Sequence, residues 1–160
     1  MSLLKSIGGK KVNFDFNKDF LSIFTDKIKT SDIKFINQTL KDLHPSDVAN
    51  LIENLSVEIR AKLIEIEEFN IDPEIFVEIN ESIQTEVLQL LSTDSIAKIL
   101  KRLESDNSIA ILENLEEKKK IAVLDKLPPK DRFLLEEGLS YPEDSAARIM
   151  QREFTAIPSN

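Results

Sequence analysis

The chain lacks cysteine and tryptophan and contains only three glycines, one tyrosine and one histidine. Without cysteine it can form neither a disulfide nor a thiolate metal site, which fits a reducing compartment. The single histidine, His44, cannot build a histidine metal cluster, so no zinc site is expected. The glycines, Gly8, Gly9 and Gly138, form no phosphate-binding loop.

Long apolar runs are also missing. No uninterrupted apolar run exceeds four residues, as in Ile121-Ala-Val-Leu124, whereas a membrane-spanning helix needs about twenty. The N-terminus has no signal-peptide core. We therefore expect no direct membrane insertion by this chain.

Basic residues are scarce in the middle of the chain. The net charge is −8, and no lysine or arginine lies between Lys62 and Lys98. The same stretch carries nine acids: Glu65, Glu67, Glu68, Asp72, Glu74, Glu78, Glu81, Glu86 and Asp94. Nucleic acid and anionic lipid need basic surface, so neither is expected as a partner. Cations and basic protein surfaces are favoured instead.

Leucine, or once isoleucine, recurs every twelve residues. The positions are Leu43, Leu55, Ile79, Leu91, Leu103, Leu115, Leu127 and Leu139, and only Glu67 breaks the count. Each unit opens with capping residues, such as Ser92-Thr93-Asp94, and continues with apolar residues at helical spacing. Helices of about ten residues are marginal alone in water, so they must stack. The repeat predicts an all-α solenoid, a surface that holds a partner rather than a catalytic pocket.

The chain divides into three parts on this basis. Residues 1–30 form an N-terminal extension with one amphipathic helix near 14–29, and residues 31–140 form the helical superhelix. Residues 141–160 form a linker helix and the start of a further region. Helices are expected near 32–43, 45–55, 57–68, 73–80, 82–91, 94–103, 106–115, 117–127 and 129–139. Gly138 is expected to end the last of these with a left-handed cap.

The segment Tyr141-Pro-Glu-Asp-Ser-Ala-Ala-Arg-Ile-Met-Gln-Arg-Glu-Phe-Thr-Ala-Ile-Pro158 resembles the link between the N-terminal cytosolic domain and the CBS domains of MgtE-type magnesium transporters. The preceding repeat is also similar to that N-terminal domain, over roughly residues 31–160. The resemblance implies a right-handed, armadillo-like superhelix of short stacked helices. It also implies that the region beginning within 141–160 is a CBS region.

The function that the resemblance implies is regulatory. The chain would be a magnesium-sensing cytosolic domain that gates a transporter or channel pore through divalent-dependent packing against CBS domains. Its partners would be the CBS domains and transmembrane pore of the same polypeptide, in a homodimer. The chain would lie at the cytoplasmic face of the cell membrane.

Magnesium is a hard cation that keeps several waters and binds one or two carboxylates. The resemblance implies an aspartate pair one helical turn apart, which falls on Asp106 and Ala110. Ala110 has no ligand atom, so half of the pair is present. An acid in the first turn also complements the helix dipole, so Asp106 remains open to a purely structural interpretation.

The acidic stretch offers a second candidate metal site. Glu74, Glu78 and Glu81 are spaced i, i+4 and i+7 and are expected to share a helix face. Like charges at this spacing cost only about 0.2–0.5 kcal/mol per pair. A solvated face tolerates that cost, so the three acids form a weak divalent site, a docking patch or simply a solvated surface.

Two other functional classes compete with this hypothesis. A protein–protein interaction module similar to the N-terminal region of the flagellar motor-switch protein FliG would also be helical. The linker motif speaks against that alternative. An enzyme is not expected, because the sequence shows no nucleophile–base pair and no metal cluster.

Overall fold

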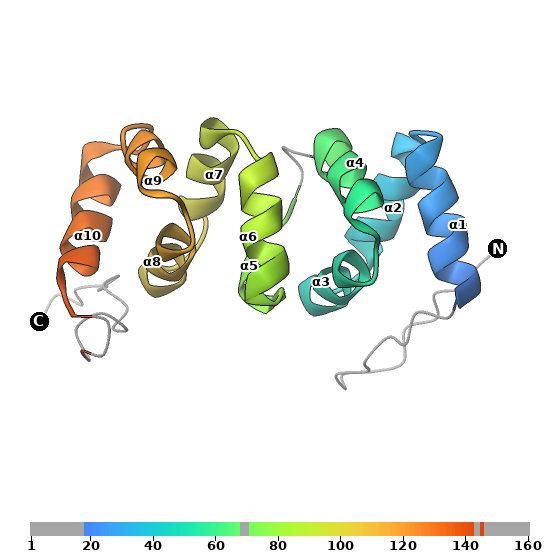
Figure 1. Cartoon of the computed structure of the whole chain (residues 1–160), viewed down its shortest axis with the longest axis horizontal. Helices are drawn as coiled ribbons and strands as arrows, with labels where there is room; N and C mark the ends of the chain where they lie inside the picture. The colour runs from blue at the N-terminus through green and yellow to red at the C-terminus, as the bar shows by residue number, and fades with distance from the viewer. Residues whose placement is uncertain (1–17, 68–70, 143–144, 146–160) are drawn as a thin grey trace, which may run out of the picture.

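A computed structural model of the chain describes residues 18–67, 71–142 and 145. This part is helical and contains no strand. Its elements are α1 (Lys18–Lys29), α2 (Ile33–Asp42), α3 (Pro45–Glu53), α4 (Val57–Glu67), α5 (Ile75–Glu78), α6 (Glu81–Leu90), α7 (Thr93–Leu100), α8 (Ser105–Glu113), α9 (Glu117–Leu124) and α10 (Pro129–Ser140). Figure 1 shows them stacked along one long axis, with α1 at one end and α10 at the other. The prediction of an all-α superhelix of short helices is confirmed.

Helices two apart in the sequence pack against each other. α3 contacts α5, α4 contacts α6, α7 contacts α9 and α8 contacts α10, while α1 contacts α2 and α4. Each helix therefore buries its apolar stripe on neighbours rather than standing alone, as expected for helices this short. No helix in the part that the structure describes is long and apolar enough to cross a bilayer. The division into three parts stays a prediction, and residues 1–17 and most of the predicted linker at 141–160 lie outside the described residues.

The leucine repeat marks the ends of helices. Leu55, Leu115 and Leu127 each lie just past a helix and are buried. Their backbone amides donate to carbonyls three residues earlier, at 3.2, 3.2 and 3.1 Å. Leu91 and Ile79 are themselves the C-cap residues of α6 and α5. Each twelve-residue unit is therefore one short helix followed by a tight turn, and an apolar side chain is buried at the turn.

The expected cap at Ser92 is confirmed, and two further caps bear on the candidate residues. Ser92 caps α7, and its hydroxyl accepts from the Ser95 amide at 3.2 Å. α3 is capped by His44, whose imidazole Nδ1 accepts from the Ser46 amide, and Pro45 occupies the first turn. At α8 the cap residue is Glu104, which places Asp106 inside the first turn.

Gly138 does not form the expected left-handed cap. It lies buried inside α10, which continues to Ser140. A Cβ atom at this position would lie 2.2 Å from Cδ1 of Ile109 on α8. The residue is therefore small because two helices approach closely there, and the prediction of a helix-ending glycine was wrong.

Free carbonyls at the ends of several helices accept hydrogen bonds from side chains of later helices. Lys62 donates to the Lys29 carbonyl at 2.6 Å, and Gln84 donates to the Phe76 carbonyl at 2.6 Å. Lys119 Nζ on α9 donates to three carbonyls at the end of α6, those of Leu88, Gln89 and Leu91, at 2.8, 3.1 and 2.8 Å. These bonds satisfy groups that a short helix leaves unpaired.

Candidate functional site

The acidic stretch maps to the middle of the stack, on α5 and α6 and the ends of their neighbours. Two of its acids are paired with basic side chains from other parts of the stack. Glu86 on α6 pairs with Arg60 at 2.5 Å, and Asp94 on α7 pairs with Lys126 at 3.2 Å. The Arg60–Glu86 pair is largely buried and belongs to the packing of the stack, whereas the Asp94–Lys126 pair lies exposed on the surface.

The three candidate acids of this stretch do not share one helix. Glu74 is the N-cap of α5 and Glu78 is its last residue, whereas Glu81 is the first residue of α6. The helix breaks because Ile79 of the twelve-residue repeat is extended, with ψ 142°, and Asn80 opens α6 by accepting from the Ile83 amide at 3.1 Å. The prediction that Glu81 shares a helix face with Glu74 and Glu78 was therefore wrong.

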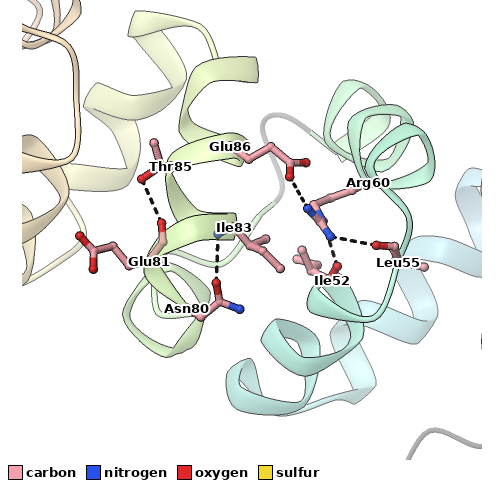
Figure 2. Close-up of polar contacts among 8 residues, drawn as sticks. All are labelled: Ile52, Leu55, Arg60, Asn80, Glu81, Ile83, Thr85 and Glu86. Carbon is pink, nitrogen blue, oxygen red and sulfur yellow. Dashed lines mark hydrogen bonds and ion pairs between the residues drawn. The ribbon is translucent and has the colours of Figure 1, made fainter.

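All three acids nevertheless lie exposed on the surface of the same short segment. Among the described residues, no lysine or arginine forms an ion pair with Glu74, Glu78 or Glu81. Figure 2 shows the Glu81 side chain directed away from the Arg60–Glu86 pair. Their charge is therefore left for solvent or for a partner.

Asp106 is the second residue of α8 and is half-buried. Its Oδ1 accepts from the Asn107 amide at 2.8 Å, as an acid in a positive first turn should. Ala110 is exposed one turn further along. The structure thus places a single carboxylate at this position. No three His, Asp or Glu side chains in the described ranges are grouped so that they could hold a metal ion, and a metal role for the four acids stays a prediction.

Arg60 is a key residue that sequence reasoning missed. Its side chain is buried, and its residue exposure is only 5%. Nε donates to the Ile52 carbonyl at 3.1 Å and Nη2 to the Leu55 carbonyl at 2.8 Å, while Nη1 donates to Glu86 Oε2 (Figure 2). Arg60 therefore ties α3 and α4 to α6. In the sequence, the only sign of this role is that Arg60 stands among the apolar residues of the helix predicted at 57–68.

Only one of the two carboxylate oxygens of Glu86 has a hydrogen-bond partner among the described residues. Its Oε1 atom is buried and has no hydrogen-bond partner among the described residues. The side chain as a whole keeps 30% of its surface exposed. The ion pair therefore joins two layers of the stack and leaves one buried carboxylate oxygen without a partner in the described residues.

A cavity of about 380 Å³ opens beside this junction, between α2, α3, α4 and the start of α5. Its wall is mostly apolar, with a few polar groups. The lining residues are Asn37, Leu40, Lys41, Leu43, Pro45, Val48, Ile52, Leu63, Ile64, Ile71, Asp72 and Ile75. The four candidate metal residues do not line it.

The stack of short helices defines the described part of the chain as an all-α superhelical domain that carries an exposed acidic segment. The model of the MgtE intracellular N domain matches residues 43–144, which is more than half of the chain. The chain belongs to this family. The resemblance noted from the sequence is thereby confirmed, and it is favoured over the likeness to FliG.

Solved structures share the fold. The crystal structure of the soluble part of a magnesium transporter is 19% identical, with a TM-score of 0.68 over 84% of this chain and 53% of that one. The crystal structure of the cytosolic domain of the Mg²⁺ channel MgtE in complex with ATP is 23% identical, with a TM-score of 0.72 over 86% of this chain and 56% of that one. The chain thus spans about half the length of each. No curated protein sequence matches it.

Proposed function

We propose that this chain is the regulatory, magnesium-sensing cytosolic domain of a magnesium transporter or channel. The observation that carries the proposal is the family match over residues 43–144. The two solved structures with the same fold support it, because both are soluble parts of magnesium transport proteins. In this role the chain is a non-catalytic module at the cytoplasmic face of the membrane.

The acidic segment supplies a physical basis for sensing. Glu74, Glu78 and Glu81 are exposed and have no basic partner among the described residues, so a second acidic surface brought against them would be repelled. Carboxylate oxygens are the ligands that Mg²⁺ prefers, and it takes one or two of them while keeping its waters. Bound between two such surfaces, the ion neutralises the repulsion and favours the packed state.

The facing surface is assigned to CBS domains of the same polypeptide. Asp106 offers one carboxylate from α8 and the acids of α5 and α6 offer others, each to its own ion, because these side chains are not grouped around one position. Packing of this domain against the CBS domains restrains the transmembrane pore in a homodimer, and loss of the packing releases it. Since each surface holds only part of the ligand set, the isolated chain binds the ion poorly.

Limited proteolysis of the full-length protein tests this proposal. Magnesium in the millimolar range should raise resistance to cleavage, whereas sodium chloride at equal ionic strength should not, because it only screens charge. The triple variant Glu74→Gln, Glu78→Gln, Glu81→Gln and the single variant Asp106→Asn should each shift the magnesium midpoint upward. Glu65→Gln, an exposed acid of α4, removes the same single charge as Asp106→Asn and should leave the midpoint unchanged.

The proposal fails if magnesium and sodium chloride protect equally, or if neither protects. A shift of the midpoint in Glu65→Gln as large as that in Asp106→Asn would also contradict it, since the effect would then be one of total charge. Magnesium uptake by cells that carry the full-length gene gives a second readout. Deleting residues 18–140 should remove its regulation by internal magnesium.

A further inference from the structure

One unit of the stack has an unusually short helix. α5 has only four residues, whereas the other helices in the described part of the chain have eight to twelve. This unit also follows Glu67, the one break in the leucine count. α5 packs on α3, and a helix of about one turn covers less of its neighbour than a helix of two or three turns. Part of α3 is therefore left without a covering helix.

The cavity of about 380 Å³ lies at this place, between α2, α3, α4 and the start of α5. Six of its lining side chains are aliphatic and belong to residues at most 8% exposed: Val48, Ile52, Leu63, Ile64, Ile71 and Ile75. A water molecule needs roughly two to four polar partners to be held inside a protein, and these side chains offer none. The interior of the cavity is therefore suited to an apolar molecule.

Polar groups lie at the opening of the cavity. Lys41 and Asp72 are exposed, and Asn37 is half-buried one helical turn before Lys41 on α2. Neither Lys41 nor Asp72 forms an ion pair with another described residue. A cation and an anion at one opening offset each other, so neither sign of charge on a ligand is favoured. The Asn37 side chain carries both a hydrogen-bond donor and an acceptor.

We propose that this cavity binds a small aliphatic molecule that carries one uncharged hydrogen-bonding group, such as a hydroxyl or an amide. The aliphatic part fills the interior, and the polar group meets Asn37 at the opening. The volume falls within the range of small-molecule sites, which are mostly apolar with a few polar groups. An apolar cavity of about 150 Å³ already takes up benzene. The site is separate from the acids proposed to bind magnesium, none of which lines it.

Methyl NMR of the full chain, with 1-octanol as the probe, tests the site. The probe should shift the Cδ1 methyl signals of the cavity isoleucines, Ile52, Ile64, Ile71 and Ile75. It should leave unchanged those of three isoleucines that are also buried but do not line the cavity, Ile96, Ile109 and Ile111. Equal shifts in both groups, or no shift in the first, would overturn the proposal.

Probes of the same chain length distinguish the head groups. Octanoate and octylammonium should each bind at least about tenfold more weakly than 1-octanol. A charged head group gives up water on binding, and its attraction to one of Lys41 and Asp72 is offset by repulsion from the other. Binding of either ion as tight as that of 1-octanol would overturn the assignment of an uncharged ligand.

Variants that fill the cavity show whether the probe binds inside it. Val48→Phe and Ile75→Phe should each weaken 1-octanol binding about tenfold or more. Val57→Phe, on the surface of α4 at a residue that is 58% exposed, adds the same ring and should leave binding unchanged. Circular dichroism identifies the variants that keep their helices. Unchanged binding in a folded cavity variant would place the probe elsewhere and contradict the proposal.

Hydrogen exchange measures the effect of the bound probe on α5. Ile75 at the start of this helix lines the cavity, and so short a helix depends on its packing. The amides of Val77 and Ile79 donate to the Glu74 and Ile75 carbonyls at 3.1 and 3.0 Å. Their exchange should slow about tenfold when 1-octanol is present at ten times its Kd, while the amides of α9 should not change. Equal slowing in α5 and α9, or none in α5, would contradict binding at this cavity.

Discussion

At the scale of single residues, long polar side chains complete helices that are too short to satisfy their own backbone. Arg60, Lys119 and Gln84 each reach back to carbonyls of an earlier helix. Burial lowers the pKa of Lys119, and the nearby carboxylate of Glu116 opposes that shift. Basic side chains that look like surface charge in the sequence are thus part of the internal hydrogen bonding.

The Asp32 carboxylate makes the stability of the fold depend on pH. It caps α2 by accepting from the Phe35 amide at 3.2 Å and accepts from Lys27 Nζ at 2.8 Å. The Lys27 hydrogen bond, followed by that of the Phe35 amide, holds the Asp32 pKa below its ordinary value of 3.8. The carboxylate therefore stabilises the fold above that value, and the contribution is lost as pH falls through the lowered pKa.

We expect Asp32→Asn to be less stable than the natural chain at neutral pH, because the amide still caps but carries no charge for Lys27. The difference should shrink toward zero as pH falls below 3.8, where the natural side chain also becomes neutral. Thermal unfolding measured across this range checks the prediction. A difference that stays constant with pH would contradict it.

The close contact at Gly138 gives a second test at this scale. Gly138→Ala should lower the free energy of unfolding by about 1 kcal/mol, because overpacking against Ile109 outweighs the better helix propensity of alanine. In an Ile109→Val background the clashing Cδ1 atom is absent, so the same change should be neutral or stabilising. Urea unfolding of the four proteins measures the coupling. Additive effects would show that the two side chains do not meet.

At the scale of elements, the turn between α1 and α2 carries local strain. Ser31 has φ 53°, the left-handed region. Its amide donates to the Ile28 carbonyl and the Asp32 amide donates to the Lys27 carbonyl, each at 3.0 Å. This is the Schellman arrangement, in which glycine is the usual residue. The chain accepts a serine there at a cost in backbone energy.

Ser31→Gly should therefore raise the free energy of unfolding by about 1 kcal/mol, or the melting temperature by about 2–4 °C. Thr30→Gly, one residue earlier in the same turn, is the control and should destabilise the chain, because Thr30 does not adopt a positive φ. Circular dichroism melting curves of both variants decide the matter. Stabilisation by both variants, or by neither, would refute the strain argument.

At the scale of the whole molecule, the Arg60 network joins the first helices to the later ones. Arg60→Met should lower the free energy of unfolding by roughly 3 kcal/mol, because two buried carbonyls and the Glu86 carboxylate lose their donor. Glu86→Gln should cost less, since an amide oxygen still accepts from Arg60. Urea titration provides the values.

Arg132→Met is the matched control for this prediction. Arg132 also pairs with two carboxylates, those of Asp125 and Glu136, but its side chain is 41% exposed. Its loss should change the free energy of unfolding far less than the loss of Arg60 does, as for surface ion pairs in general. Equal losses at Arg60 and Arg132 would show that the buried network does not hold the layers together.

The sequence by itself determined the helical class, the twelve-residue unit and most of the helix starts, because these depend on spacing and caps within a few residues of each other. Family membership also followed from motifs along the chain. Only the tertiary structure decided that Ile79 and Asn80 separate Glu78 from Glu81, that Gly138 serves a helix contact, and that Arg60 faces Glu86. These features depend on residues far apart in the sequence meeting in space, and on competition between a local pattern and the packing of the next layer.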